Sequence, residues 1–294
     1  MLNKFRVVLS LLLIFGFSAT LFGKERKDAY FAHVPGSYWV YKDQDGNELT
    51  RRAVENKEIE GEMYSSFSYE PIWEDWTDYD YHIHPNFYKV GEERVTFLMG
   101  DAAQKAIKAR LTKEMGTLRT ILRLMMEGFD LLYEIEAETE DPFYVLPTSV
   151  TSNAAWEAMQ INAKITMRSD PPQDPEEMIL EITIVETGKV LGTEDVETSA
   201  GTFENCLKIE YQTETKVETF PLDQADQVPN PPGESVTTLW VAPNVGIVKF
   251  HQKREDTVLK ALPPLPHPLF KVSTTIETLE LKAYEVKSAD SGTE

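Results

Sequence analysis

The chain has a single cysteine, Cys206, among 294 residues. One thiol cannot form an internal disulfide, so the fold must be stabilised by a hydrophobic core rather than by covalent cross-links. A lipidated amino-terminal cysteine is excluded as well, because position 206 lies far from the start of the chain. Hydrophobic residues make up 41% of the sequence and aromatic residues 11%, which is typical of a globular protein rather than a disordered one.

Positive charge is also scarce. Lysine and arginine together number 29 against 49 aspartate and glutamate residues, which gives a formal net charge of −20. A surface this acidic repels phosphate backbones, so we expect no binding to nucleic acid.

Only the first residues form a long apolar run. The basic segment "MLNKFR" precedes the apolar run Val7–Phe22, and Gly23 precedes the charged "KERKD". This order is typical of a secretory signal peptide, and the apolar run is shorter than the ~20 residues of a spanning helix. We therefore predict a signal peptide at residues 1–23, a mature chain of 24–294 with a charge of −22 once Lys4 and Arg6 are removed, and a periplasmic or secreted location. The alternative is an uncleaved amino-terminal anchor.

Most of the remaining sequence has the pattern of β-strands. Runs rich in Val, Ile, Thr, Tyr and Phe alternate with turn clusters such as "SDPPQDPEE" and "PNVG", and Asp45-Gly46 is a hairpin signal. The expected strands include "EMYSSFSY", "DYDYHIH", "RVTFLM", "AWEAMQINAKITMR", "MILEITIVE", "NCLKIEYQTETKVETF", "SVTTLWVA", "GIVKFHQKR" and "LFKVSTTIETLELKAYEV". We predict a mainly β (α+β) protein in which residues 24–294 form one domain, a curved antiparallel sheet or incomplete β-barrel.

The segment 101–129 is the exception, because its pattern is helical. Apolar residues recur there in steps of three and four, at Ile107, Leu111, Met115, Leu118, Leu122, Met125 and Phe129. The other face is basic, with Lys105, Lys108, Arg110, Lys113, Arg119 and Arg123. One interpretation is a helix that packs its apolar stripe on the sheet. The other is a lid or docking helix whose basic face makes peripheral contact with an anionic membrane or an acidic partner.

Three motifs in order resemble those of the TapB-like family, a group of uncharacterised exported bacterial proteins. They are "VPGSYWVYKDQDGNE", "SAGTFENCLKI" and "LWVAPNVGIVKF", which together span Val34 to Phe250. Asn244 and the large helical segment depart from the family pattern. The resemblance implies a fold similar to that of the LolA lipoprotein carrier, in which a curved antiparallel sheet forms an incomplete barrel and a helix packs over its open side.

Cys206 lies within the second motif. Alternation along the predicted strand places it on the polar face, opposite Leu207, Ile209 and Tyr211, and only a bulge near Glu204-Asn205 would turn it inward. We expect a passive thiol packed against its neighbours. One alternative is an accessible thiol that links two chains. The other is a catalytic nucleophile, which the absence of a neighbouring histidine disfavours.

The stretch "WEDWTDYDYHIHP" has the residues best suited to chemistry. On a strand, Asp78, Asp80, His82 and His84 would share one face, and a His-x-His pair can bind zinc with carboxylates completing the shell. A half-buried strand with aromatics inward and charges outward shows the same alternation, and we therefore expect no metal. Common hydrolase, phosphate-loop and dinucleotide motifs are absent.

These observations favour a non-enzymatic cell-envelope protein without a cofactor, which binds an apolar ligand, such as a lipid or lipoprotein, or an envelope partner in the concavity of its sheet. The residues expected to line the cavity or its lid are Leu111, Leu118, Leu122, Met125, Trp39 and Trp240. The alternatives are a metal-dependent enzyme centred on Asp78, Asp80, His82 and His84, and a structural interaction module with a filled core.

Overall fold

The computed structural model describes residues 30–288 except 73, 92–93, 99–100, 141–142, 148–154, 173–175, 221–229 and 264. The expected signal peptide lies outside these residues. The described elements are β1 (Tyr38–Asp43), β2 (Glu48–Ile59), β3 (Glu62–Glu70), β4 (Phe87–Val90), β5 (Arg94–Leu98), α2 (Ala102–Met125), β6 (Asp130–Thr139), β7 (Phe143–Pro147), β8 (Ala155–Asp170), β9 (Met178–Thr198), β10 (Gly201–Phe220), β11 (Ser235–Ala242), β12 (Gly246–Glu255), α3 (Thr257–Ala261) and β13 (Thr274–Glu285).

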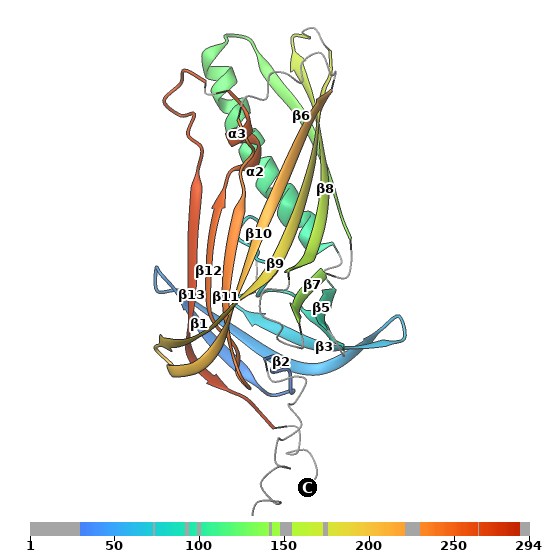
Figure 1. Ribbon diagram of the computed structural model, residues 1–294. Helices are drawn as coiled ribbons and strands as arrows, with labels where there is room; N and C mark the ends of the chain where they lie inside the picture. The colour runs from blue at the N-terminus through green and yellow to red at the C-terminus, as the bar shows by residue number, and fades with distance from the viewer. Residues whose placement is uncertain are drawn as a thin grey trace, which may run out of the picture.

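All thirteen described strands belong to one sheet, which confirms the predicted mainly β fold. Their order is β6-β8-β9-β10-β11-β12-β13-β1-β2-β3-β4-β5-β7, and every pair of neighbours is antiparallel. The sheet is not closed, because β6 and β7 form its two edges. Figure 1 shows the long strands β8–β12 running along the molecule while β2 and β3 cross its lower end.

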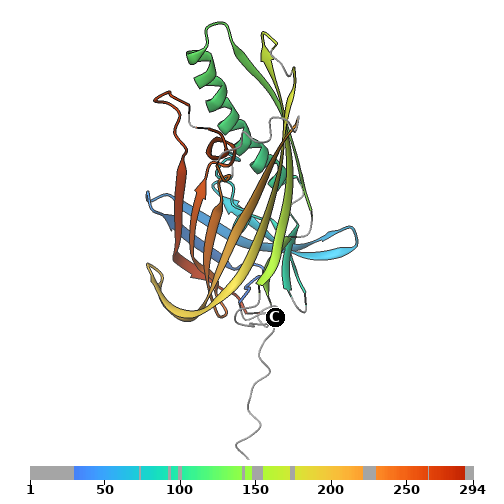
Figure 2. The same ribbon diagram turned by 45° about the horizontal axis from the view of Figure 1, so that its top comes forward.

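Helix α2 lies on the concave side of the long strands, in the upper part of the molecule (Figures 1 and 2). It ends at Met125, four residues before the expected boundary, and Gly116 does not interrupt it. Its buried residues are Ala103, Ala106, Ile107, Leu111, Glu114, Met115, Leu118 and Ile121, so the apolar stripe packs against the sheet as the first interpretation requires. Within the part of the chain that the structure describes, no helix is long and apolar enough to span a membrane.

The hairpin predicted at Asp45-Gly46 joins β1 to β2. Asp43 Oδ1 accepts hydrogen bonds from the backbone N–H groups of Asp45 and Asn47, at 2.9 and 2.7 Å, and Gly46 has a φ of 93°. Glycine adopts this conformation without the clash that a Cβ would cause. Strands β4, β6 and β7 were not predicted from the sequence. Strand β6 contains several glutamates, and glutamate is uncommon in strands.

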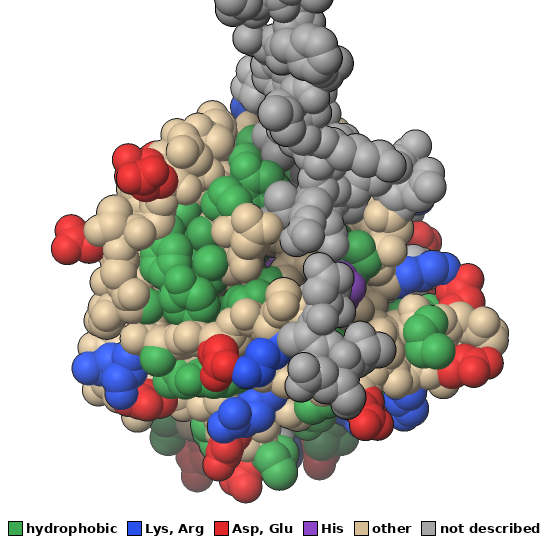
Figure 3. All heavy atoms as spheres, turned by 90° about the horizontal axis from the view of Figure 1, so that it is seen from below, with side chains coloured by type: hydrophobic (Ala, Val, Ile, Leu, Met, Phe, Trp, Pro, Cys, Tyr) green, Lys and Arg blue, Asp and Glu red, His purple; other side chains and the backbone are tan. Residues whose placement is uncertain are grey.

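Apolar side chains from both the long strands and the crossing strands meet in a single core. In its lower half the core is largely aromatic, since the rings of Phe31, Phe67 and Tyr88 pack with centroids 4.9 to 6.0 Å apart. From below, hydrophobic side chains gather in the middle of this end and charged side chains lie around its rim (Figure 3).

Cys206 is fully buried, so its expected position on the polar face is wrong. The register between β9 and β10 shifts between Phe203 and Cys206, and Asn205 has a φ of 54°. These features mark a bulge at Glu204-Asn205, the irregularity that would be needed to turn the thiol inward. Cys206 Sγ lies 3.4 Å from the carbonyl oxygen of Phe203, and burial raises the pKa of the thiol to about 11. The expected packing of the thiol against its neighbours is confirmed, and its lack of reactivity stays a prediction.

Candidate ligand cavity and buried polar network

The segment Trp76–Asn86 passes through the interior of the sheet as an irregular loop, and the strand expected at residues 78–84 is wrong. Backbone N–H groups of Ile83 and His84 donate to the carbonyl oxygen of Asp80, at 3.3 and 2.9 Å, which closes a turn. Residues 79–84 are all buried, so their aromatic and charged side chains do not divide between core and solvent. The alternation of polar and aromatic residues did not predict a strand correctly here, because both the polar and the aromatic side chains are buried and contact partners in the interior.

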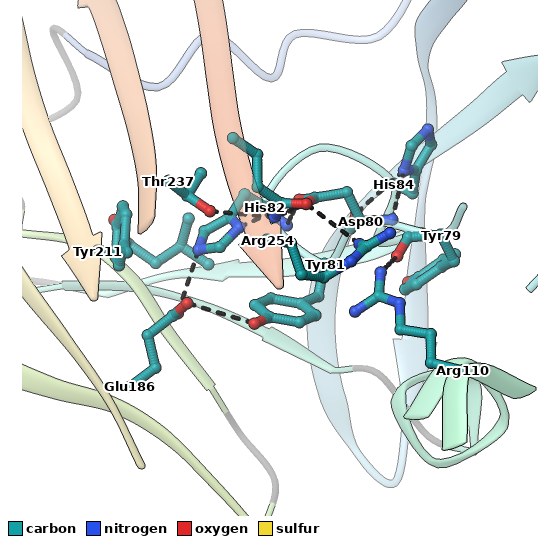
Figure 4. A network of polar contacts seen from close by, with 12 residues as sticks. Tyr79, Asp80, Tyr81, His82, His84, Arg110, Glu186, Tyr211, Thr237 and Arg254 are labelled. Carbon is teal, nitrogen blue, oxygen red and sulfur yellow. Dashed lines mark hydrogen bonds and ion pairs between the residues drawn. The ribbon is translucent and has the colours of Figure 1, made fainter. Parts of the chain in front are cut away.

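His82 lies between two buried carboxylates (Figure 4). Its Nδ1 is 3.0 Å from Asp80 Oδ1, and its Nε2 is 3.1 Å from Oε2 of Glu186 on β9. Asp80 Oδ1 also accepts the backbone N–H of His82 at 2.7 Å, and the Tyr81 hydroxyl donates to Glu186 Oε1 at 3.3 Å. Since both ring nitrogens face carboxylate oxygens, the arrangement suits an imidazolium that donates to both.

Electrostatics agree with this protonation state. Burial lowers the pKa of His82, but the carboxylates of Glu186 and Asp80 outweigh burial and raise the pKa to about 10. Burial raises the pKa of Asp80, yet the neighbouring His82 holds it well below the usual range of an aspartate. At neutral pH, the buried loop is therefore held to β9 by a charged pair.

A second branch of the network joins the loop to the carboxyl half of the sheet. Gln252 Nε2, on β12, donates to Asp80 Oδ2 at 2.6 Å and to the Thr237 hydroxyl at 3.1 Å. Arg254 Nη1 donates to Gln252 Oε1 at 3.1 Å. Asp80 thus contacts groups from its own loop and from β12, and residues 172 positions apart are brought together.

The four metal candidates do not form a common site. Asp78 is exposed, while His84 faces its own backbone, with Nδ1 accepting the N–H of Asp80 at 3.0 Å. Burial lowers the pKa of His84 to about 4, so the ring is neutral. Across the described residues, no group of three or more His, Cys, Asp or Glu side chains is arranged to hold a metal ion.

A cavity of about 300 Å³ lies beside this network, between α2 and the inner face of the sheet. Its apolar wall is formed by α2, α3 and the long strands, and includes Ile107, Leu111, Met159, Ile161, Ile184 and Leu259. Its polar wall includes Thr77, Tyr81, Arg110, Thr213 and Arg254. The volume lies at the lower end of the range for small-molecule sites, which is about 300 to 1,000 Å³.

Arg110 and Arg254 share one acceptor in the cavity wall. Arg110 Nε and Arg254 Nη2 both donate to the carbonyl oxygen of Thr77, at 3.1 and 3.4 Å, and Arg110 Nη2 also donates to the carbonyl oxygen of Tyr79. The two half-buried cations therefore lie close together. Burial and the charge of Arg254 lower the pKa of Arg110 to about 10.

Of the residues expected to line the cavity, Leu111 does so. Leu118 is buried in the core and Leu122 is half-buried against it. Met125 is 38% exposed, so the expectation that it faces inward is wrong: it lies in the last turn of the helix, where Leu124 and Met126 are exposed as well.

Trp39 and Trp240, the two tryptophans that were expected to line the cavity, lie outside it. Trp39 is buried in the lower core, where its indole N–H donates to the carbonyl oxygen of Val245 at 2.7 Å. Trp240 is half-buried on the outer face, and its indole N–H donates to Glu194 Oε1 at 2.5 Å. A ligand role for these residues stays a prediction.

The basic face of α2 is partly neutralised by nearby acids. Arg119 forms a bidentate pair with Asp130 at 2.7 and 2.5 Å, Arg123 lies 3.7 Å from the same carboxylate, and Lys105 pairs with Asp101. Arg110 faces the cavity rather than a surface. Membrane contact through this face stays a prediction with Lys108 and Lys113 as its remaining exposed cations.

Sequence analysis missed Glu186, Gln252 and Arg254. Glu186 and Gln252 carry a recognisable signal, because each is a polar residue at an inward-facing position of a predicted strand and is buried to 2 or 3% exposure. A buried polar side chain requires a partner, and a search for such pairs would have led to the Asp80 loop.

Comparison with known proteins gives a family and two distant structural likenesses. The DUF3108-like family model matches residues 107–259, just over half of the chain. A Bacteroides fragilis protein provisionally described as exported with a YmcC-like fold has a TM-score of 0.36 and 14% identity, and the match covers 87% of this chain and 98% of that one. A Parabacteroides distasonis protein provisionally described as a lipoprotein has a TM-score of 0.35 with the same identity and coverage. No curated protein matches the chain. The expected TapB-like and LolA-like resemblances stay predictions.

Proposed function

The chain belongs to the DUF3108-like family, and we propose that it is an exported, non-catalytic protein that binds a small, largely apolar ligand under helix α2. The observation that carries the proposal is the cavity of about 300 Å³ between the helix and the inner face of the sheet. A structural module with a filled core would pack this space with side chains, because protein interiors are close-packed. Export is supported by the signal-peptide pattern of residues 1–23.

A binding role is favoured over a catalytic one by how the reactive side chains are used. His82 is held between two carboxylates and His84 faces its own backbone, while the Cys206 thiol is buried in the sheet. General acid–base or nucleophilic catalysis needs such groups within reach of a substrate. The cavity wall instead offers apolar side chains with a few polar groups, which is typical of a ligand site.

Filling the cavity tests the proposal. Ile184 lines it from β9, so Ile184→Trp should occupy the space that a ligand needs. We expect this change to weaken binding of the neutral fluorescent probe N-phenyl-1-naphthylamine at least tenfold. Val185→Trp is the matched control, because it adds the same ring to the opposite face of the same strand.

The proposal fails if the wild-type protein binds no probe, or if both variants bind it as the wild type does. Native mass spectrometry of the protein from its own host provides a second readout, in which a bound small molecule should be lost in Ile184→Trp and retained in Val185→Trp.

A further inference from the structure

Two cations in the cavity wall have no direct counter-ion. Among the described residues, neither Arg110 nor Arg254 forms an ion pair with a carboxylate, although Asp80 acts on Arg110 at longer range and the half-buried Glu277 acts on both arginines. Each guanidinium also keeps one nitrogen without a hydrogen-bond partner in the described part of the chain, Nη1 of Arg110 and Nε of Arg254. This is unusual in a chain of net charge −20, where carboxylates outnumber cations.

The acidic residues around the cavity do not supply the missing charge. Both carboxylate oxygens of Glu114 accept backbone N–H groups at the start of α3, at 2.7 to 3.0 Å. Glu255 pairs with Lys260, and Asp256 Oδ2 accepts the N–H of Ser273 at 2.7 Å. These three carboxylates are already engaged within the protein.

The remaining charges of the lining are exposed and balance one another. Asp78 and Glu234 are the other acids, and Lys113 and Lys271 are the other bases. Among the bases of the lining, the two arginines are therefore the half-buried ones. Holding two like charges close together in a partly buried site is costly unless an anion joins them.

The cations lie beside apolar surface. Arg110 extends from α2 toward the loop, and Arg254 extends from β12 toward the same loop (Figure 4). Ile107 and Leu111 of the helix line the same cavity as Met159 and Ile184 of the sheet. Guanidinium groups bind carboxylate, sulfonate and phosphate oxygens with paired N–H donors. An ion alone would leave the apolar wall without a partner.

We propose that the cavity binds an amphiphile whose anionic head lies between Arg110 and Arg254 and whose apolar body lies against the helix and the sheet. This rests on the proposed function and adds the chemical class of the ligand. The head can be a carboxylate, sulfonate or phosphate, since all three present oxygens to the same donors.

A matched pair of probes tests the proposal. N-phenyl-1-naphthylamine is neutral, and 8-anilinonaphthalene-1-sulfonate has the same ring system with an added sulfonate. We expect the wild-type protein to bind the anionic probe at least tenfold more tightly than the neutral one, despite its own negative charge. This comparison needs no variant.

Three variants locate the preference. Arg254→Gln and Arg110→Gln should each weaken the anionic probe about tenfold and change the neutral probe less than twofold. Lys108→Gln removes the same charge from an exposed position of α2 and should change neither. Thermal unfolding followed by circular dichroism establishes that each variant is folded, and a glutamine variant that does not fold is replaced by the methionine variant of the same residue. Arg254→Lys keeps the charge and should keep most of the preference.

Competition separates an amphiphile from a free anion. Octanoate should displace the anionic probe, whereas inorganic phosphate at the same concentration should not. Equal displacement by phosphate would overturn the amphiphile. Equal binding of the two probes, unchanged in the arginine variants, would overturn the anionic head while leaving the proposed function standing. Failure of both probes to bind would overturn the proposed function itself.

Discussion

His82 and Glu186 lie 104 positions apart in the chain, and His82 Nε2 lies 3.1 Å from Glu186 Oε2 inside the curved sheet. The loop that carries His82 is bonded to β3 at its end, through Asn86, and side-chain bonds to β9 and β12 hold its middle in the interior. The same loop supplies Thr77 and Tyr81 to the cavity wall. Stability of the fold and shape of the cavity therefore depend on one set of polar contacts.

The protonation of His82 should make stability depend on pH. The folded protein holds this proton up to about pH 10, whereas the unfolded chain releases it near pH 6.5. The contribution is fully present below pH 6.5 and is lost as the pH rises toward 10, at up to about 1.4 kcal/mol per pH unit. NMR titration of the histidine rings should show His82 still protonated at pH 8. In denaturant unfolding, the stability advantage of the wild type over His82→Gln should be largest below pH 6.5 and should shrink as the pH rises toward 10. Parallel profiles would contradict the assignment.

Glu114 should be important for the docking of α3 against α2. Its carboxylate accepts the backbone N–H groups of Thr257, Val258 and Leu259. Glu114→Ala leaves these donors unsatisfied and should lower the free energy of unfolding by about 1–3 kcal/mol. Glu114→Gln keeps one acceptor oxygen and should cost less. Chemical denaturation of both variants measures the difference, and equal losses would show that the acceptor is unimportant.

Cys206 should be unreactive in the folded protein. The thiol is buried and its pKa is raised to about 11, so little thiolate forms at neutral pH and a reagent cannot reach it. A chromogenic disulfide reagent should label less than a tenth of the protein in an hour, and one equivalent once guanidinium unfolds it. Rapid stoichiometric labelling of the folded protein would restore the alternative of a thiol that links two chains.

Two glycines should respond in opposite directions to alanine. A Cβ at Gly188 would lie 2.4 Å from the Trp156 ring, so Gly188→Ala should force the ring to move and destabilise the protein by about 1–3 kcal/mol. A Cβ at Gly116 in α2 would meet nothing closer than the Tyr133 hydroxyl at 3.6 Å, and Gly116→Ala should stabilise the helix by about 0.5–1 kcal/mol. Thermal unfolding of the two variants checks both signs.

Local patterns were sufficient to predict most of the fold. Alternation identified the long strands from β8 to β12, and three- and four-residue spacing identified α2, because these elements bury one side of a regular structure. The inward turn of Cys206 needed a bulge, which alternation cannot place by itself.

Local sequence patterns predicted less of the candidate site than of the fold. Asp80 and His82 were recognised as a polar cluster, but their partners Glu186 and Gln252 come from distant strands and no local spacing records the pairing. The loop's conformation follows from those tertiary bonds rather than from its own propensity, which favoured a strand. The cavity arises from the distance between α2 and the sheet, and that distance is a property of the assembled layers.

An open sheet has two edge strands, and the acidic residues of this chain affect whether an edge strand can pair with a strand of another molecule. Strand β6 is an edge strand whose Glu134, Glu136 and Glu138 are exposed. Two molecules that paired along this edge would bring rows of like charge opposite each other, which opposes pairing. The same glutamates that made β6 hard to predict therefore oppose pairing of this strand with a strand of a second molecule. At low pH, or in high salt, that protection weakens, and the propensity of the protein to form β-linked aggregates should rise.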